Sequence, residues 1–483
     1  MSSTRQFFGT DGVRGPYGGL VVNEMFFALL ACAAGEWVKE QGAGRRETGS
    51  PTAPGAGTAG KSVLIGRDPR TSGESLTQAV TVGLRVAGME PLDLGVLPTP
   101  AVALMVKTEG AALGVVVTAS HNPAGDNGIK FFKRGGLKLS DAEEARIETL
   151  LARVGERVKA ALINGGAGST PGCLVPEFSD NYAAAMMGLL PASALRGWHV
   201  VLDTANGATS ATSRIVLEKL GAEIFRIGSI GIGNGANRGR INDGVGSEHP
   251  EKMCAAVRAA GARLGIAHDG DGDRCVLCDE HGEVLDGDEV LTLLALHALR
   301  EGRLAADTLV VTVQSNLGVD AAVTAAGGRV LRTPVGDRHV AEAMRAAGAM
   351  LGGESSGHII CADVSPSGDG LVAALRVIGV MLATGQPLSE LRRGLKKFPQ
   401  ASTTVTVAAG AAKPGLETLP ALAAAVRALE TELGARGRVL ARWSGTEPKL
   451  RLLVEGPTDE AVRDGLARLA AAARADLGAT ATG

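Results

Sequence analysis

The sequence lacks an excess of charge of either sign, because 49 basic residues stand against 51 acidic ones and the formal net charge is -2. A protein that binds nucleic acid or an anionic membrane through its general charge needs a broad positive field, which this composition does not supply. We therefore expect neither nucleic acid nor a membrane as a partner. An anionic ligand has to be met by a local group of basic residues.

Long uninterrupted apolar runs are also missing. The longest, MFFALLACAAGEWV from Met25, contains Glu36. It falls short of the ~18 uninterrupted apolar residues that a membrane-spanning helix needs, so we predict a buried helix. The first residues, MSSTRQFFGTDG, lack the order of basic, apolar and small residues typical of a secretory signal. The expected location is the cytoplasm.

Cysteine is scarce, with six residues in the chain, and in the cytoplasm these are expected to be reduced. Cys275 and Cys278 form a C-x-x-C pair, but no second pair completes a zinc site. Positions three apart on a strand point to opposite faces. We therefore interpret the pair as buried strand cysteines and not as a metal or redox site.

The chain of 483 residues is too long for one core, because a domain usually contains roughly 100 to 200 residues. Residues 1–165, 166–283 and 284–396 each alternate strand-like with helix-like stretches, which predicts three related α/β domains with mixed, mostly parallel sheets. Residues 397–483 predict a smaller α+β domain with a largely antiparallel sheet. Residues 42–60, rich in Gly, Pro, Ser and Thr, predict a mobile surface insertion without chemistry.

Polar loops that follow apolar strands are the candidate sites, since such sheets bind ligands at the carboxyl ends of their strands. The first loop is TASHNPAGDNG, where Ser120 and His121 follow a run of valines. A hydroxyl beside a histidine suggests a nucleophile. These residues alone leave open whether it accepts an acyl or a phosphoryl group.

The second loop is HDGDGDR, in which Asp269, Asp271 and Asp273 alternate with glycines. An extended backbone would place the three carboxylates on one side, and a hard divalent cation would relieve their repulsion. Mg²⁺ suits a site with three protein ligands and open positions for substrate oxygens. A calcium-binding EF-hand is the alternative, but Arg274 stands where that loop requires glycine, and both flanks look like strands.

The third loop, GGESSGH, contains the G-x-S-x-G pattern of α/β-hydrolases at residues 353–357. His358 is the last histidine of the chain, so no histidine follows a separate acid and the order of the hydrolase triad is not met. Glu354, Ser356 and His358 are instead predicted to contact a hydroxylated ligand.

The fourth loop, RWSGTEPKLR, combines hydroxyls and backbone N–H groups with three basic side chains, which predicts a phosphate cradle. Its residues are Arg442, Ser444, Gly445, Thr446, Lys449 and Arg451.

Five motifs in one order, FGTDGVRG, TASHNPAGDNGIKFF, HDGDGDR, GGESSGH and RWSGTEPKLR, extend from Phe8 to about Glu455. They resemble the signatures of the α-D-phosphohexomutase superfamily, and within it those of the bacterial enzymes that act on glucosamine phosphates. The resemblance implies a heart-shaped arrangement of four domains, and it leaves monomer and homodimer both open.

The same resemblance implies that Ser120 is carried as phosphoserine and phosphorylates a bound sugar phosphate. Mg²⁺ would be held by Asp269, Asp271, Asp273 and an oxygen of the phosphorylated Ser120. Glucosamine 6-phosphate and glucosamine 1-phosphate would interconvert through glucosamine 1,6-bisphosphate, which also serves as activator. The product would feed UDP-N-acetylglucosamine and cell-wall synthesis.

Individual roles are implied as well. His121 and Lys130 match positions near the transferred proton, with the base left open between them, and Arg14 and Arg274 match positions around the phosphoserine. The pair that would hold sugar hydroxyls consists of Glu354 and Ser356, and Arg442, Ser444, Gly445, Thr446 and Arg451 would bind phosphate.

Three departures from the family pattern are Trp443 in the phosphate motif, His268 before the aspartates, and Ser355 in the variable position between Glu354 and Ser356. His268 is not expected to bind the metal, because hard Mg²⁺ prefers oxygen. Phosphomannomutase or phosphoglucomutase activity is the alternative within the superfamily. The VGDRH stretch at Val335–His339, together with the opening motif, favours the glucosamine branch.

Overall fold

The computed structural model describes residues 5–43, 60–163, 177–229, 238–408, 413–444 and 448–478. Its contacts divide the chain into two units, one formed by Met1–Val313 and Leu331–Arg393 and the other by Gln314–Val330 and Gly394–Gly483. Most of the predicted insertion at 42–60 lies outside the described residues, as do Gly445 and Thr446.

The first sheet has the order β1-β5-β4-β2-β3, with β6 paired to β5. Its strands are β1 (Val13–Pro16), β2 (Ser62–Arg67), β3 (Glu90–Val96), β4 (Leu113–Val117), β5 (Asp126–Lys133) and β6 (Leu137–Lys138). The accompanying helices are α1 (Glu24–Ala43), α2 (Gly73–Val86), α3 (Thr99–Thr108) and α4 (Asp141–Ile163). The apolar run from Met25 lies in α1, where Phe27, Leu30 and Cys32 are fully buried, so the prediction of a buried helix is confirmed.

The second sheet has the order β11-β10-β9-β7-β8. Its strands are β7 (His199–Asp203), β8 (Glu223–Ile227), β9 (Leu264–His268), β10 (Cys275–Cys278) and β11 (Val284–Leu285), and its helices are α5 (Glu177–Met187), α6 (Thr209–Lys219) and α7 (Glu251–Ala260). Cys275 and Cys278 are buried on β10, and burial raises the pKa of both thiols. They are therefore protonated strand residues, as interpreted from the sequence.

The third sheet has the order β13-β12-β14-β15. Its strands are β12 (Thr308–Thr312), β13 (Arg329–Thr333), β14 (Leu351–Gly353) and β15 (Ile359–Cys361), and its helices are α8 (Gly287–Arg300), α10 (Asp337–Ala347), α11 (Gly370–Thr384) and α12 (Leu388–Leu391). No single helix in the described residues is both long and apolar enough to cross a membrane, and α11 meets that test only together with the bent segment Leu388–Gly394.

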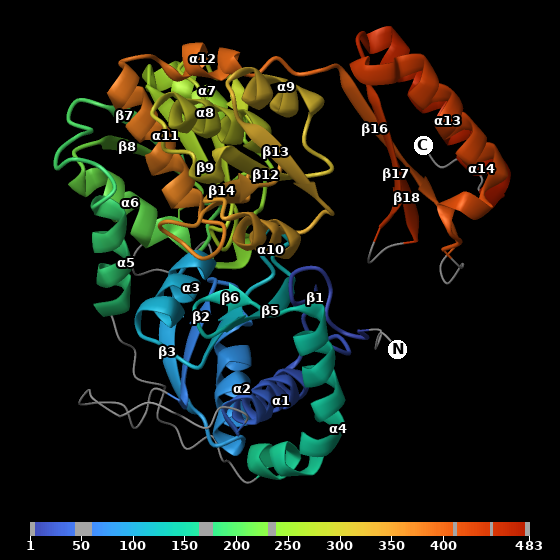
Figure 1. Ribbon diagram of the computed structural model, residues 1–483. Helices are drawn as coiled ribbons and strands as arrows, with labels where there is room; N and C mark the ends of the chain where they lie inside the picture. The colour runs from blue at the N-terminus through green and yellow to red at the C-terminus, as the bar shows by residue number, and fades with distance from the viewer. Residues whose placement is uncertain are drawn as a thin grey trace. The chain divides into compact units, whose positions relative to one another are not determined.

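The second unit contains the antiparallel sheet β16-β18-β17. Its elements are α9 (Leu317–Ala325), β16 (Gln400–Thr406), α13 (Pro420–Leu433), β17 (Arg438–Trp443), β18 (Lys449–Glu455) and α14 (Asp459–Leu477). Helices α13 and α14 pack on the sheet around a core that includes Leu429, Leu450 and Leu469, as Figure 1 shows for this unit. The predicted α+β arrangement is confirmed.

Short 3-10 turns complete the described chain: η1 (Arg238–Arg240), η2 (Ala305–Asp307), η3 (Arg392–Gly394), η4 (Leu416–Thr418) and η5 (Gly434–Arg436).

The three α/β sheets share one feature that positions the candidate site. In each, a strand that pairs in parallel with its neighbour is followed by a polar loop and then by an antiparallel strand: β4 to β5, β9 to β10 and β14 to β15. A short loop can join antiparallel neighbours but not parallel ones. The sheets are therefore mixed, and the Ser120, aspartate and Glu354 loops occupy the same place in their respective sheets.

The close packing of α2 on α1 can be tested at Gly83. A Cβ added at Gly83 in α2 would lie 2.0 Å from the backbone oxygen of Ala28 in α1. We expect Gly83→Ala to destabilise the protein by ~1–3 kcal/mol, because the helices would have to separate. Thermal unfolding of the purified variant measures the effect.

Gly155 in α4 is the matched control, since a Cβ there would meet nothing within 4 Å. Gly155→Ala should leave stability unchanged or raise it by up to ~1 kcal/mol, because alanine is the better helix former. Equal unfolding midpoints for the two variants would contradict the packing argument.

Candidate active site

Ser120 lies in the loop between β4 and β5 and is almost fully buried, with 1% of its surface exposed. Its backbone φ of 53° falls in the left-handed region, which is uncommon for a residue with a side chain. The hydroxyl of Thr118 accepts a hydrogen bond from the Ser120 backbone N–H at 2.9 Å. The loop is thus held in an unusual conformation exactly where the serine hydroxyl is presented.

Two side chains from elsewhere in the chain hold this loop by its carbonyl oxygens. Arg70 donates to the carbonyls of Ser120 at 3.1 Å and Asn122 at 2.8 Å, and also to those of Pro123 and Asp126. Asn242 donates to the same Ser120 and Asn122 oxygens at 2.8 and 2.9 Å. The loop conformation therefore depends on contacts that are distant in sequence.

Arg70 is itself fixed by a fully buried ion pair with Asp68, in which Nε lies 2.9 Å from Oδ2. Asp68 also accepts a hydrogen bond from the Thr118 hydroxyl at 2.7 Å. Sequence reasoning missed Arg70 and Asn242. The signal for Arg70 was the GRDPR stretch, which places charged residues directly after a buried strand.

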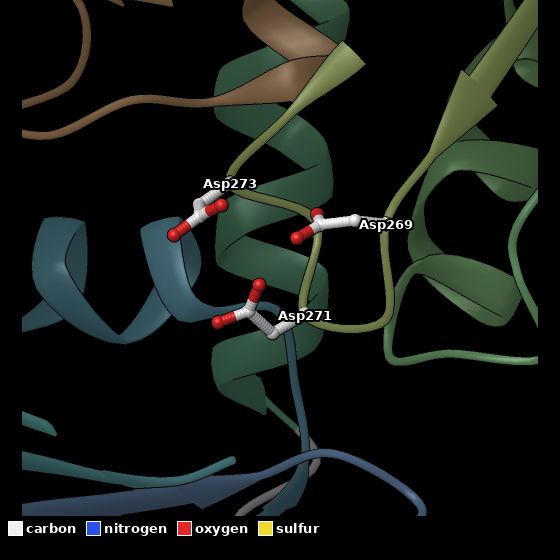
Figure 2. A group of neighbouring side chains, drawn as sticks. All are labelled: Asp269, Asp271 and Asp273. Atoms are coloured by element: carbon white, nitrogen blue, oxygen red, sulfur yellow. The ribbon is translucent and has the colours of Figure 1, made fainter. Parts of the chain in front are cut away.

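The aspartate loop between β9 and β10 gathers three buried carboxylates. Asp269, Asp271 and Asp273 are exposed by 1%, 0% and 3%, and a ligand oxygen of each lies within 4.8 Å of the others. Figure 2 shows the three carboxylates gathered around a common space beside the loop. Burial, reinforced by repulsion from Asp271 and Asp273, raises the pKa of Asp269 well above its ordinary value.

The serine and aspartate loops meet directly. The Ser120 hydroxyl donates to Asp269 Oδ2 at 2.6 Å. A Cβ on Gly270 would lie 2.6 Å from the Ser120 carbonyl oxygen, so only glycine permits this approach of the two backbones. His121 Nδ1 lies 3.3 Å from the Ser120 hydroxyl.

The residues of the triad fit a hard divalent cation. Oδ1 of Asp271 and Oδ1 of Asp273 are buried without a hydrogen-bond partner, and oxygen atoms left in this way are the ligands that such a cation prefers. Among the described residues, this triad of aspartates is the group of at least three Asp, Glu, His or Cys side chains that lie close enough together to hold a metal. His268 faces away, with its ring nitrogens near the Ser213 hydroxyl and the Arg274 carbonyl.

Lys130 on β5 supplies positive charge to the triad. Its Nζ lies 2.8 Å from Asp271 Oδ2 and 2.9 Å from both Asp273 Oδ2 and Asp11 Oδ2. Burial alone would lower the pKa of Lys130, but these carboxylates raise it well above its ordinary value. Thr99 donates to Asp271 Oδ2 at 2.7 Å. Asp11 and Thr99 were not identified from the sequence, although Asp11 lies in the quoted GTDG motif.

The two arginines implied by the resemblance lie near the serine loop. Arg14 donates to the Ala119 carbonyl at 3.4 Å and pairs with Asp11. The Arg274 backbone N–H donates to Asp269 Oδ1 at 3.3 Å, and its guanidinium lies 3.2 Å from Glu248. Burial, with the charges of Arg274 and Arg14, lowers the pKa of His121 to about 4.

The loop between β14 and β15 separates its predicted residues. Glu354 accepts a hydrogen bond from the Gly336 backbone N–H at 2.9 Å, and Ser356 is exposed. His358 is instead buried between two carboxylates, with Nε2 3.2 Å from Asp337 Oδ2 and Nδ1 3.6 Å from Asp273 Oδ1. The structure therefore brings His358 to the aspartate loop.

The predicted phosphate residues of the second unit lie at the turn between β17 and β18. Arg442 and Arg451 are directly opposite each other in this antiparallel pair, and Lys449 is two residues from Arg451. Alternation along a strand places all three cations on one face of the sheet. Ser444 is buried, and its carbonyl accepts a hydrogen bond from Lys413. Trp443 donates to the Pro414 carbonyl at 2.8 Å.

Comparison with known proteins identifies the family to which this chain belongs. Models of the phosphoglucomutase/phosphomannomutase family match residues 5–158 (alpha/beta/alpha domain I), 177–282 (domain II), 286–398 (domain III) and 403–472 (C-terminal domain). The phosphoglucosamine mutase of Frankia alni is 45% identical over 98% of this chain and 99% of its own length. The chain belongs to the phosphoglucosamine mutase family.

A second relative and a solved structure agree with this family. The phosphoglucosamine mutase of Acidothermus cellulolyticus is 44% identical over 99% of this chain and 98% of that protein. The crystal structure of a phosphoglucomutase/phosphomannomutase family protein from Burkholderia thailandensis has a TM-score of 0.77 at 23% identity, and the match covers 99% of each chain. That structure supports the fold. Family membership makes the chain an intramolecular phosphotransferase, as the sequence motifs predicted.

Replacing Arg70 tests whether this residue positions the serine loop or only stabilises the fold. Arg70→Met should destabilise the protein by ~3–5 kcal/mol, because it leaves Asp68 buried without its ion-pair partner. It should also lower mutase activity, because the carbonyls of the serine loop lose their donors. Thermal unfolding and a mutase assay measure the two effects.

The double variant Asp68→Asn, Arg70→Met removes the unpaired charge and should recover part of the lost stability. It should not recover activity, since the serine loop still lacks its donors. Recovery of both together would show that Arg70 acts only on stability.

Proposed function

We propose that this chain interconverts glucosamine 6-phosphate and glucosamine 1-phosphate, with Ser120 as the carrier of the phosphoryl group. The observation that carries the proposal is the contact between the Ser120 hydroxyl and Asp269 at 2.6 Å, inside a buried acidic triad. The buried serine hydroxyl thus lies beside a group of acids that can hold a cation. The relatives' shared name supports the amino sugar as substrate.

Asp269, Asp271 and Asp273 are the proposed ligands of Mg²⁺, together with an oxygen of the phosphorylated Ser120. When bound there, the cation would neutralise charge on the transferring group. Lys130 holds Asp271 and Asp273 by their Oδ2 atoms at 2.8 and 2.9 Å, and the Oδ1 atom of each has no hydrogen-bond partner.

In the proposed transfer, the bond between phosphorus and Ser120 Oγ breaks as a sugar hydroxyl oxygen bonds to phosphorus. The hydroxyl proton leaves to a base, Ser120 Oγ takes up a proton to become a hydroxyl, and the sugar becomes the 1,6-bisphosphate. Reversal at the other phosphate returns a phosphoryl group to Ser120 and releases the isomer. His121 and Lys130 are the two candidates for the proton acceptor. The lowered pKa of His121 keeps its imidazole neutral and able to accept a proton, whereas the raised pKa of Lys130 keeps it an ammonium group, which can only donate.

Glu354 and Ser356 are proposed to hold sugar hydroxyls. Glu354 is already oriented by the Gly336 N–H, and Ser356 is exposed at its loop. In the second unit, the cations Arg442 and Arg451 with Ser444, Gly445 and Thr446 are proposed to bind the phosphate that is not transferred. Charge-assisted hydrogen bonds from arginine suit this task.

Replacing the serine tests the carrier role. Ser120→Ala should fold normally but lose mutase turnover, because its side chain cannot carry the phosphoryl group. Intact mass after incubation with glucosamine 1,6-bisphosphate should show a phosphate shift for the wild type and none for the variant.

Ser75→Ala is the control, because Ser75 lies in α2 and its hydroxyl donates to the Ser72 carbonyl. It should keep both the mass shift and turnover. Turnover near the wild-type level in Ser120→Ala would refute the carrier role.

Substrate choice is the sharper test of the family branch. We expect kcat/KM for glucosamine 6-phosphate to exceed that for glucose 6-phosphate or mannose 6-phosphate at least about tenfold, which corresponds to ~1.4 kcal/mol. One charge-assisted hydrogen bond to the amine can supply this difference. The three sugars are compared at equal Mg²⁺, each with its matching 1,6-bisphosphate.

Equal or reversed ratios would favour phosphomannomutase or phosphoglucomutase activity. That outcome would leave the role of Ser120 untouched, because the carrier mechanism does not depend on the substituent at C2.

A further inference from the structure

Six titratable side chains around the aspartate loop form a closed ring in which carboxylates alternate with basic side chains. In order, they are Asp11, Lys130, Asp273, His358, Asp337 and Lys138. Lys130 joins Asp11 to Asp273 at 2.9 Å on each side, and His358 joins Asp273 to Asp337 at 3.6 and 3.2 Å. Lys138 closes the ring through ion pairs with Asp11 and Asp337.

The ring draws its members from the surroundings of three different sheets. Asp11, Lys130 and Lys138 belong to the region of the first sheet, and Asp273 follows β9 of the second. Asp337 begins α10, and His358 precedes β15, so both belong to the third. The ring is therefore the place where three α/β regions share one set of charges.

Among the described residues, Lys138 forms ion pairs with Asp11 and Asp337, which lie outside the proposed machinery, and these two pairs complete the ring. Its side chain is 15% exposed, and its partners Asp11 and Asp337 are 23% and 10% exposed, so all three are largely shielded from water. Ion pairs in such surroundings are screened less than surface pairs, and losing one partner leaves the other charge uncompensated. Of the ion-pair partners of Asp337 in the described part of the chain, His358 would then remain.

The next residue in the chain strengthens the same connection. Arg338, buried in α10, lies 2.8 Å from Asp141 and 3.0 Å from Glu144 at the start of α4, and it donates to the Leu139 carbonyl at 3.0 Å. Two consecutive residues of the third region thus bind the segment 138–144 of the first.

We propose that Lys138 and Asp337 are positioning residues for phosphoryl transfer. Their ion pair holds the start of α10 against the first region, which keeps His358 between Asp337 and Asp273 and so fixes one carboxylate of the triad. The reaction part of this inference rests on the proposed function. The effect on Asp273 and on metal binding does not.

Lys133 provides a matched control. It pairs with Glu143 at 2.8 Å, and the side chains of the two are 30% and 23% exposed. Both partners belong to the first region, and neither is a member of the ring. Lys133→Met therefore removes a lysine ion pair from the neighbouring strand without opening the ring.

The experiment compares Lys138→Met, Lys138→Arg and Lys133→Met with the wild type. Calorimetric titration with Mg²⁺ measures metal affinity, hydrogen exchange measures protection of residues 336–342, and a mutase assay gives kcat and KM. Lys138→Met should lose ~10–100-fold in Mg²⁺ affinity or kcat, which is typical when a residue that orients metal ligands is removed. It should also lose protection in 336–342, with little change in KM.

Lys138→Arg keeps the charge and should restore most of both losses, whereas Lys133→Met should match the wild type throughout. The proposal would be overturned if Lys138→Met and Lys133→Met had the same Mg²⁺ affinity, the same hydrogen exchange and the same kcat. If Lys138→Met does not fold, Asp337→Asn, which keeps the side-chain shape, is measured in its place and judged by the same outcomes. A wild type without mutase activity would refute the proposed function, while Mg²⁺ titration and exchange would still decide whether Lys138 positions the triad.

Discussion

The burial of three carboxylates in one short loop is the constraint on which the rest of the site depends. Asp269, Asp271 and Asp273 are nearly inaccessible to water, so their charges must be compensated by the protein or by a bound cation. Lys130 compensates one side of the group, where it contacts Asp271 and Asp273. On the other side, Asp269 faces the Ser120 hydroxyl and has a raised pKa. The carboxyl whose charged form the surroundings support least thus lies beside the serine.

The repeated topology of the three α/β sheets explains how residues so distant in sequence reach this point. Each sheet places a polar loop after a parallel strand and returns antiparallel, so the same structural position carries the serine, the aspartates and Glu354 in turn. Contacts such as Ser120 with Asp269 and Asp273 with His358 then join neighbouring repeats. One fold used three times provides three different chemical groups.

The sequence was informative where function depends on local patterns. Ser120 and the three aspartates were predicted because hydroxyls, acids and glycines at strand ends are local signals, and α1 was predicted because an interrupted apolar run indicates a buried helix. Arg70, Asn242 and Lys138 could not be predicted in the same way. Arg70 and Asn242 hold the carbonyl of Ser120, which is 50 or more residues away from each of them. Lys138 acts through an ion pair with Asp337 of the third region. In the sequence alone, such polar and charged residues are indistinguishable from solvated surface positions.

Burying this many charges is not the most stable way to fill the space between three α/β regions. Well-packed apolar side chains of similar volume often stabilise a protein as much as a buried ion pair, or more. A leucine or methionine in place of Lys130, Lys138 or His358 could therefore contribute as much to the stability of the fold. What apolar residues cannot provide is a fixed set of negative oxygens that remains next to Ser120 while its surroundings stay dry. Phosphorylation of Ser120 would add about two negative charges at this point. Arg14 and Arg274 lie close by and carry the opposite charge. The ring of charges is therefore best understood as the cost of holding acidic groups close to a serine that carries an anion.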